Sequence, residues 1–320
     1  MKKKIIIVAG EPNSINSEII AKSWKSKSKS LRNRIIIIGN YELIKNQLKI
    51  LKISIPLNKI KKIDGFLSKN KLNILDIPLK FKNPFKINSK DIRKYLFLCF
   101  EYAHKISKQK KTAGFINCAI NKKILFQDDS TGITEYLAKK NKLKQYFVMM
   151  IYNRLLSVVP ITTHIKLKDI HKNLNKKIIV NKVKVLNNFY YKLLKKKPNI
   201  AVLGINPHNS ELRKNSEEQK IIAPAIMKLK KLNIKISGPY SADTAFTKKN
   251  RSNFDVIVGM YHDQVLTPFK TLFEFDAVNV TLGLDYIRLS PDHGIAADII
   301  KKNKANTTSL INSIKFIEKL

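Results

Sequence analysis

Three of the six histidines in the sequence follow short apolar runs that are typical of buried strands. They are His164 after Leu155–Pro160, His208 after Ile200–Gly204, and His262 after Phe254–Gly259. Ligands of open α/β sheets collect beyond the carboxyl ends of the strands, so side chains carried there can meet. Three imidazoles can bind a catalytic divalent metal and leave a position for substrate. Each histidine alone fits an ordinary hydrogen-bonded residue at a strand end, but their shared placement favours a metal site.

Asp263 directly follows His262 in the stretch Gly259–Gln264. A carboxylate beside a ligand histidine can orient its ring or accept a proton. An aspartate just after a strand is equally typical of a helix N-cap, where it accepts a bond from a backbone N–H. The sequence leaves these roles open.

The elements that would position these side chains alternate between strand and helix patterns. Strands are predicted at Lys4–Ala9, Arg34–Ile38, Asn73–Ile77, Phe115–Ala119, Phe147–Tyr152, Leu155–Pro160, Ile200–Gly204, Phe254–Gly259 and Ala277–Thr281. Helices are predicted at Ser17–Lys25, Leu43–Leu51, Ile92–Ile106 after a cap at Ser89, Leu167–Asn173, Asn181–Lys195, 216–232 and Ser309–Lys319, with turns at Asn153-Arg154 and Gly238-Pro239. This alternation predicts an α/β fold of parallel βαβ units with right-handed crossovers.

Charge is the strongest signal in the composition, because 62 lysines and arginines stand against 23 acidic residues, a formal net charge of +39. Such an excess raises nucleic acid or an anionic membrane surface as a partner. The lysines, however, are spread along the whole chain, with few aromatic residues beside them to stack on bases. We therefore expect weak binding of polyanions and no specific nucleic-acid function.

The sequence predicts neither a membrane protein nor a disulfide-stabilised one. Gly10–Pro12 cuts short the apolar run Ile5–Ala9, so we interpret that run as a first strand rather than a signal segment. No run approaches the length of a membrane span. Cys99 and Cys118 lie in apolar runs without disulfide or zinc spacing. We expect a cytoplasmic protein with both cysteines in its core.

Several segments resemble the 4-hydroxythreonine-4-phosphate dehydrogenase family, in the family's order and at its spacing. They are ITTH (161–164), LKD (167–169), GINPH (204–208), GPYSADTAF (238–246), MYHDQ (260–264), VNVTLGL (278–284) and IRLSPDHG (287–294). The resemblance covers essentially the whole chain, and the segments around His262 and Arg288 are the most specific.

The resemblance implies an α/β fold of the isocitrate/isopropylmalate-dehydrogenase-like kind. Residues 1–320 would form one enzyme unit of two interleaved α/β/α lobes, with the active site in the cleft between them. It also implies a homodimer with the site at the subunit interface. Two sets of residues carry over, the metal ligands His164, His208 and His262 and the substrate contacts Thr134, Lys270, Asn279 and Arg288.

Enzymes of this family use NAD(P)+ and a divalent metal to oxidise the secondary alcohol of 4-phosphooxy-L-threonine, a step toward pyridoxal phosphate. A metal lowers the pKa of the substrate hydroxyl, which favours hydride transfer, and stabilises the enolate left when carbon dioxide departs. Lys270 and Arg288 would bind the phosphate, although a solvated basic residue is the plain alternative for both. Lys270 and Asp263 are the candidate catalytic residues. Zinc, magnesium and cobalt all remain open, and the absence of a GxGxxG fingerprint leaves the cofactor-binding residues unknown.

The chain also departs from the family at several positions. Asn13–Asn16 replaces a glycine-rich segment, Ile133 replaces a substrate-contacting histidine, and Val265 replaces a glycine, while Asn209–Leu212 lacks expected glycines. Two alternatives therefore stay open. One is a related dehydrogenase of phospho-threonate or phospho-erythronate, and the other is a basic polyanion-binding protein on an inherited enzyme fold.

Overall fold

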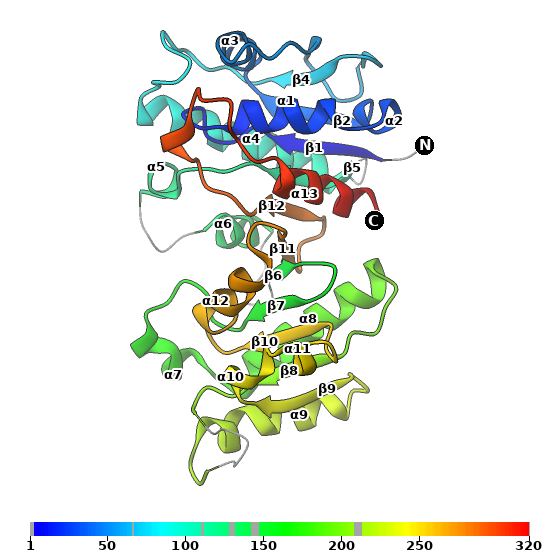
Figure 1. Cartoon of the computed structure of the whole chain (residues 1–320), viewed down its shortest axis with the longest axis vertical. Helices are drawn as coiled ribbons and strands as arrows, with labels where there is room; N and C mark the ends of the chain where they lie inside the picture. The colour runs from blue at the N-terminus through cyan, green and yellow to red at the C-terminus, as the bar shows by residue number, and fades with distance from the viewer. Residues whose placement is uncertain are drawn as a thin grey trace. The chain divides into compact units, whose positions relative to one another are not determined.

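The chain folds into two units that alternate strands and helices, as the sequence predicts (Figure 1). The computed structural model describes residues 3–65, 67–109, 112–127, 132–141, 147–207 and 213–319. Unit 1 comprises Met1–Ile133 and Asp285–Leu320, and unit 2 comprises Thr134–Leu284. Unit 2 is thus inserted into unit 1, and the last part of the chain returns to complete unit 1.

Unit 1 contains a parallel set of strands whose near-continuous Ile and Val content is typical of strands buried on both faces. The strands are β1 (Lys4–Val8), β2 (Ile35–Gly39), β3 (Leu57–Ile60), β4 (Leu72–Asp76), β5 (Thr112–Asn117) and β12 (Arg288–Pro291), in the order β3-β4-β2-β1-β5-β12. Each hydrogen-bonded pair of neighbouring strands in this set is parallel. The parallel βαβ expectation is confirmed for this unit.

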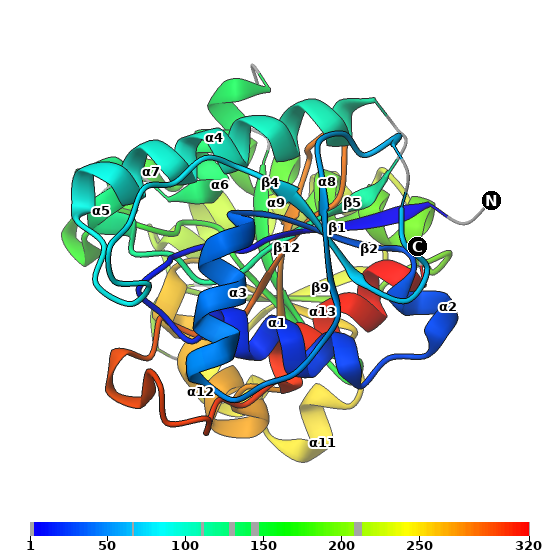
Figure 2. The ribbon, with the colours of Figure 1, turned by 90° about the horizontal axis from the view of Figure 1, so that it is seen from above.

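The helices of unit 1 cover both faces of this sheet. They are α1 (Asn16–Lys25), α2 (Lys29–Arg32), α3 (Tyr41–Ile50), α4 (Ser89–Lys108), α5 (Lys122–Phe126) and α13 (Thr308–Glu318), with a 3₁₀ turn at Ala297–Ile299. Figure 2 shows α4 on one side of the strands and α1, α3 and α13 on the other. The predicted cap Ser89 is wrong by one residue, because the Asn88 side chain accepts the N–H of Asp91 at 3.0 Å.

Unit 2 contains a mixed set of strands. They are β6 (Val148–Tyr152), β7 (Ser157–Pro160), β8 (Ile200–Leu203), β9 (Ile236–Tyr240), β10 (Val256–Gly259) and β11 (Val278–Leu282), in the order β11-β6-β7-β10-β8-β9. Strand β6 is antiparallel to both β7 and β11, so the expectation of parallel strands is wrong for β6. It is confirmed for β7, β10, β8 and β9, which pair in parallel. The short link at Asn153-Arg154 allows only a hairpin, since a parallel crossover needs a dozen or more residues.

The helices of unit 2 pack on its strands in two groups. They are α6 (Ile133–Lys140), α7 (Ile170–Asn173) after a 3₁₀ turn at Leu167–Asp169, α8 (Lys176–Leu193), a π-turn at Glu218–Ile222 leading into α9 (Ala223–Lys230), α10 (Ala242–Ala245), α11 (Lys248–Arg251) and α12 (His262–Phe273). Helices α8 and α9 contact each other, α8 contacts β6 and β11, and α12 contacts β7 and β10. Fully buried Phe269 anchors α12 in the apolar core of this unit.

Other predictions can be compared directly with the structure. The turn expected at Gly238-Pro239 is wrong, because both residues lie inside β9 and a cis peptide joins them. A Cβ at Gly238 would meet the Val202 carbonyl oxygen at 2.4 Å, so glycine is needed for this close approach of two strands. Cys99 and Cys118 are free and buried, as predicted. Among the described residues, no helix is long and apolar enough to cross a membrane.

Candidate functional site

The structure brings together two of the three histidines selected from the sequence. The ring centroids of His164 and His262 lie 6.1 Å apart, with 38° between the ring planes. His164 is exposed on the loop after β7, and the side chain of His262, the first residue of α12, is 35% exposed. Zinc–nitrogen bonds are about 2.0–2.1 Å long, which places the centroids of two rings on one tetrahedral ion about 5 Å apart. The observed 6.1 Å is about 1 Å wider, so a small movement of the two rings toward each other would let the pair share a divalent ion.

Register between two parallel strands explains why these histidines meet. Gly259 of β10 pairs with Pro160 of β7, so both strands end at the same level. Beyond that point the backbone pairing continues, because Ile161 N–H donates to the Gly259 carbonyl at 2.8 Å. The N–H and hydroxyl of Thr162 both donate to the Met260 carbonyl, at 3.1 and 2.7 Å. The two loops thus leave the sheet already bonded to each other.

His208, the third predicted ligand, lies outside the described residues. Within the described ranges, no three His, Cys, Asp or Glu side chains gather as a metal site, so the three-histidine site stays a prediction. The loop that leads to His208 is nevertheless well defined. Gln264 links it to α12, since its side chain donates to the Gly204 carbonyl at 2.6 Å and accepts the Met260 N–H at 2.6 Å.

Glu218 fixes the same loop from its other side. Its carboxylate accepts the N–H groups of Ile205 and Asn206 at 2.7 and 2.9 Å. Burial favours the neutral acid, but hydrogen bonds from the side chain and backbone of Asn206 outweigh it and lower the pKa of Glu218. Beside this loop lies a hollow of about 270 Å³ at the ends of β8, β9 and β10, lined by Gly204, Ile205, Asn206, Pro207, Ser241, Ala242, Asp243, Tyr261 and Gln264.

Asp263 acts on His262 rather than on the start of the helix. The N-cap of α12 is Tyr261, so the N-cap interpretation of Asp263 is wrong. Its Oδ1 instead lies 2.6 Å from Nδ1 of His262, which donates the hydrogen bond. A carboxylate on one ring nitrogen fixes the tautomer and leaves Nε2 as the nitrogen that can bind a metal.

Three predicted substrate contacts lie in unit 2. Lys270 is on α12, where partial burial lowers the pKa of its ammonium group. Thr134 is buried at the start of α6, with its hydroxyl 3.2 Å from that of Thr281 on β11. Asn279 lies two residues before Thr281, and alternate residues of a strand share a face. The structure therefore brings Thr134 to the face of β11 that carries Asn279.

Asn279 also has an unsatisfied polar atom. Its Oδ1 is buried and accepts no hydrogen bond from any of the described residues. A buried acceptor without a donor is destabilising, so a ligand with a donor group would be stabilised there. This position suits a substrate contact.

Arg288, the fourth predicted contact, lies on β12 of unit 1 and is only 4% exposed. Its Nε donates to Asn117 Oδ1 at 2.7 Å, at the end of β5. This bond fixes the plane of the guanidinium group. Sequence reasoning missed the roles of Asn117, Glu218 and Gln264, because each acts through a partner distant in the chain.

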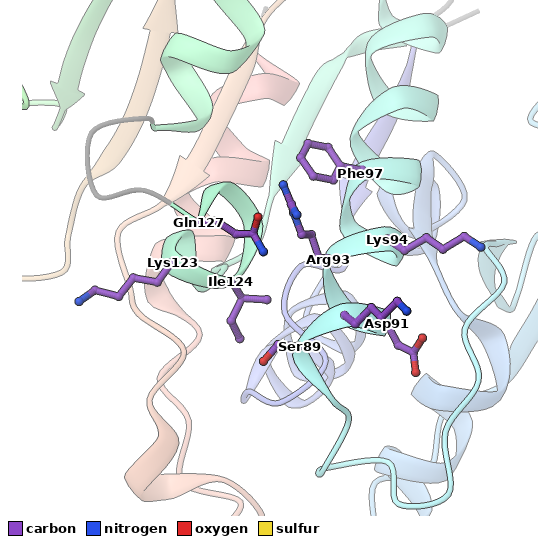
Figure 3. Close-up of a pocket in the computed structure, with 9 residues that line it drawn as sticks. Ser89, Asp91, Arg93, Lys94, Phe97, Lys123, Ile124 and Gln127 are labelled. Atoms are coloured by element: carbon purple, nitrogen blue, oxygen red, sulfur yellow. The ribbon is translucent and has the colours of Figure 1, made fainter.

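Unit 1 carries a separate hollow of about 690 Å³ along α4 and α5 (Figure 3). It is lined by four cationic side chains and one acidic one, together with Phe97 and other residues; the charged ones are Lys90, Asp91, Arg93, Lys94 and Lys123. Arg93 is held by a bond from its Nε to the Leu125 carbonyl at 3.1 Å and lies over the Phe97 ring. The hollow gathers positive charge in unit 1, and the polyanion affinity expected from composition stays a prediction.

Comparison with known proteins identifies the family of this chain and agrees with its fold. The family model "Pyridoxal phosphate biosynthetic protein PdxA" matches residues 31–317. A 4-hydroxythreonine-4-phosphate dehydrogenase of Sulfurihydrogenibium sp. is 37% identical over 98% of this chain and 96% of its own length. A D-threonate 4-phosphate dehydrogenase of Pectobacterium atrosepticum is 30% identical over the whole of both chains.

Solved structures agree as well. The crystal structure of 4-hydroxythreonine-4-phosphate dehydrogenase from Klebsiella pneumoniae matches with a TM-score of 0.85 and 30% identity, over 100% of this chain and 99% of that one. The predicted α/β fold is thereby confirmed. The chain belongs to the PdxA family of pyridoxal phosphate biosynthetic proteins.

Proposed function

We propose that the protein is a nicotinamide- and metal-dependent dehydrogenase of 4-phosphooxy-L-threonine. The product would be 2-amino-3-oxo-4-phosphooxybutanoate, which loses carbon dioxide to give 3-amino-2-oxopropyl phosphate. The observation that carries the proposal is the pairing of His164 with His262 in a chain of the PdxA family. We further propose a cytoplasmic homodimer with the active site at the subunit interface, between the two lobes.

His164 and His262 would hold the metal, with His208 as the third ligand. The donor set fits, because the two rings lie close to the spacing that one ion can bridge and Asp263 leaves Nε2 of His262 available. A bound zinc, magnesium or cobalt ion would act as a Lewis acid on the substrate oxygen, and NAD(P)+ would accept the hydride. The role of this chain is to fix the rings before substrate arrives.

Lys270, Arg288, Asn279 and Thr134 would bind the substrate. Partial burial disfavours the ammonium form of Lys270, so a phosphate partner stabilises that form and raises its pKa again. Arg288 is already oriented by Asn117 and would present a fixed planar group to the phosphate. Lys270 and Asp263 are the proposed proton-transfer groups, because Asp263 contacts His262 and Lys270 lies on the same helix, α12.

A second candidate substrate has its own support. Ile133 stands where the family has a substrate-contacting histidine, it is buried, and one relative is a D-threonate 4-phosphate dehydrogenase. An apolar side chain there removes a polar contact and so changes which substrate is preferred. A phosphorylated threonate or erythronate is therefore the alternative.

A substrate panel tests the proposal. Metal-loaded protein is mixed with NAD+ or NADP+ and each phosphorylated substrate, and cofactor reduction is followed by ultraviolet absorbance. We expect the highest kcat/KM with 4-phosphooxy-L-threonine and loss of activity after dialysis against a chelator. Preference for phospho-threonate would support the alternative. No turnover with any substrate, together with tight salt-sensitive RNA binding, would replace both with a polyanion-binding function.

A further inference from the structure

Only two basic side chains are buried in the described part of this lysine-rich chain. They are Arg288, 4% exposed, and Lys182, 7% exposed. Burying a charged group is costly unless it is paired and hydrogen-bonded. Arg288 has a proposed role in binding phosphate, whereas Lys182 is neither a proposed metal ligand nor a proposed substrate contact. The burial of Lys182 needs a reason.

Lys182 occupies a core position of its helix. On α8 it lies on the same buried face as Ile179, Val183 and Leu186, at the spacing of an apolar stripe. Burial lowers the pKa of its ammonium group to about 8, and the charge of Glu135 acts in the opposite direction. An aliphatic residue would pack equally well at this position, so packing alone does not explain why the residue is charged.

The ammonium group contacts the base of the loop that carries His164. Nζ of Lys182 donates to the Ile161 carbonyl at 2.6 Å and lies 5.7 Å from the centre of the Phe147 ring. The N–H of the same Ile161 donates to Gly259 of β10. The backbone carbonyl of Ile161 is therefore bonded to α8, and its backbone N–H is bonded to β10. Ile161 lies three residues before His164.

The same ammonium group also interacts electrostatically with the segment that carries Thr134. Glu135 follows Thr134 on α6, and its charge acts on Lys182. Its Oε2 is buried and accepts no hydrogen bond from the described residues, so a nearby cation is what offsets the cost of burying this acid. The charge of Lys182 thus interacts with two segments of unit 2, the base of the His164 loop and the start of α6.

We infer that Lys182 is a positioning residue that ties the base of the His164 loop to Glu135, and so holds the metal-binding histidine in place relative to Thr134. What the two segments bind rests on the proposed function. The link to the His164 loop rests on the hydrogen bond to Ile161, and the link to Glu135 rests on the buried Oε2 of that side chain, which has no hydrogen-bond partner among the described residues. Removing the charge should disturb both segments together.

The test uses K182M, which keeps an unbranched side chain that is one atom shorter and uncharged, with K182R as the conservative variant and K184M as the control. Lys184 lies on the same helix but is exposed. Cobalt affinity is measured by visible absorbance. The values of kcat and KM are measured with 4-phosphooxy-L-threonine. We expect K182M to weaken cobalt binding and raise KM by about tenfold each, as for other groups that orient metal ligands. K182R should recover part of both, and K184M should match the wild type.

E135Q separates the two ends of the link. It should raise KM severalfold while cobalt affinity stays within about twofold of the wild type, because Glu135 lies on the Thr134 side. In the E135Q/K182M double variant, KM should be no higher than in K182M, because both substitutions remove the same interaction and their effects do not add. Additive losses would refute the link to Glu135.

The inference is overturned if folded K182M, checked by circular dichroism, keeps both its cobalt affinity and its KM. If K182M does not fold, E135Q decides the second end of the link, and an unchanged KM in that variant refutes the link from Lys182 to Glu135. If the wild type turns over none of the substrates, the proposed function fails. Cobalt binding by K182M still tests the positioning of His164 in that case.

Discussion

Lys182 should make the stability of the fold depend on pH above neutrality. Its pKa is about 8 in the folded protein and has the ordinary value of 10.5 when the chain unfolds. The unfolded chain therefore holds this proton more tightly, and stability rises as pH increases from about 8 to about 10.5. The shift of roughly 2.5 units corresponds to ~3 kcal/mol in full, of which roughly 2 kcal/mol is gained between pH 7.5 and pH 10.

The assay compares urea unfolding of the wild type and K182M at both pH values. Other lysines and the tyrosines titrate in the same range, but they are common to both proteins and cancel in the difference. The free energy of unfolding of the wild type relative to K182M should rise by roughly 2 kcal/mol from pH 7.5 to pH 10. The control K184M should follow the wild type. A constant difference, or one that moves the other way, would show that Lys182 is not a buried ammonium group.

Two further substitutions test the proposed metal and phosphate residues. His262→Ala should abolish turnover and cobalt binding while the unfolding midpoint stays close to that of the wild type, because the ring is partly exposed; full activity after dialysis against a chelator would contradict the three-histidine site. Arg288→Lys should raise KM for the phosphorylated substrate by about tenfold, because an ammonium group lacks the planar fork that Asn117 orients; an unchanged KM would place Arg288 outside the phosphate site.

Strands with continuous apolar runs were predictable from the sequence, whereas strands defined by their neighbours were not. The Ile-rich runs of β1 and β2 show their burial directly. In contrast, β3 (Leu57–Ile60) carries lysine and asparagine, and β12 (Arg288–Pro291) carries a buried arginine. Both are strands because they pair with β4 and β5, and no local pattern records that pairing.

The same distinction applies to the site. Placement after strands predicted that His164 and His262 would lie at one edge, and the register of β7 with β10 confirms that they meet. The supporting bonds of Gln264, Glu218 and Lys182 join residues far apart in sequence. Lysines occur throughout this chain, and among the described residues only Lys182 is a buried lysine. Nothing in the sequence distinguishes it except its place on an apolar stripe of α8.

The departures from the family near the N-terminus have a physical explanation. Asn13 replaces part of a glycine-rich segment, and its side chain bonds both the N–H and the carbonyl of Ile87, at 3.0 and 2.9 Å. Asn16 donates to the Ala119 carbonyl at 2.8 Å, directly beside Gly10. These side chains hold the loop by hydrogen bonds that glycines could not supply.

Val265 fits the same pattern in unit 2. It is fully buried on α12, and a Cβ at Gly259 would lie 2.5 Å from its Cγ1, so the two residues are complementary in size. The packing of Val265 against Gly259 fixes the start of the helix that carries His262 and Lys270. Of the described departures, Ile133 alone replaces a residue that contacts substrate in the family. Changes in substrate preference are therefore expected to originate at Ile133, whereas the other substitutions change how the loops are held and not which side chains they present.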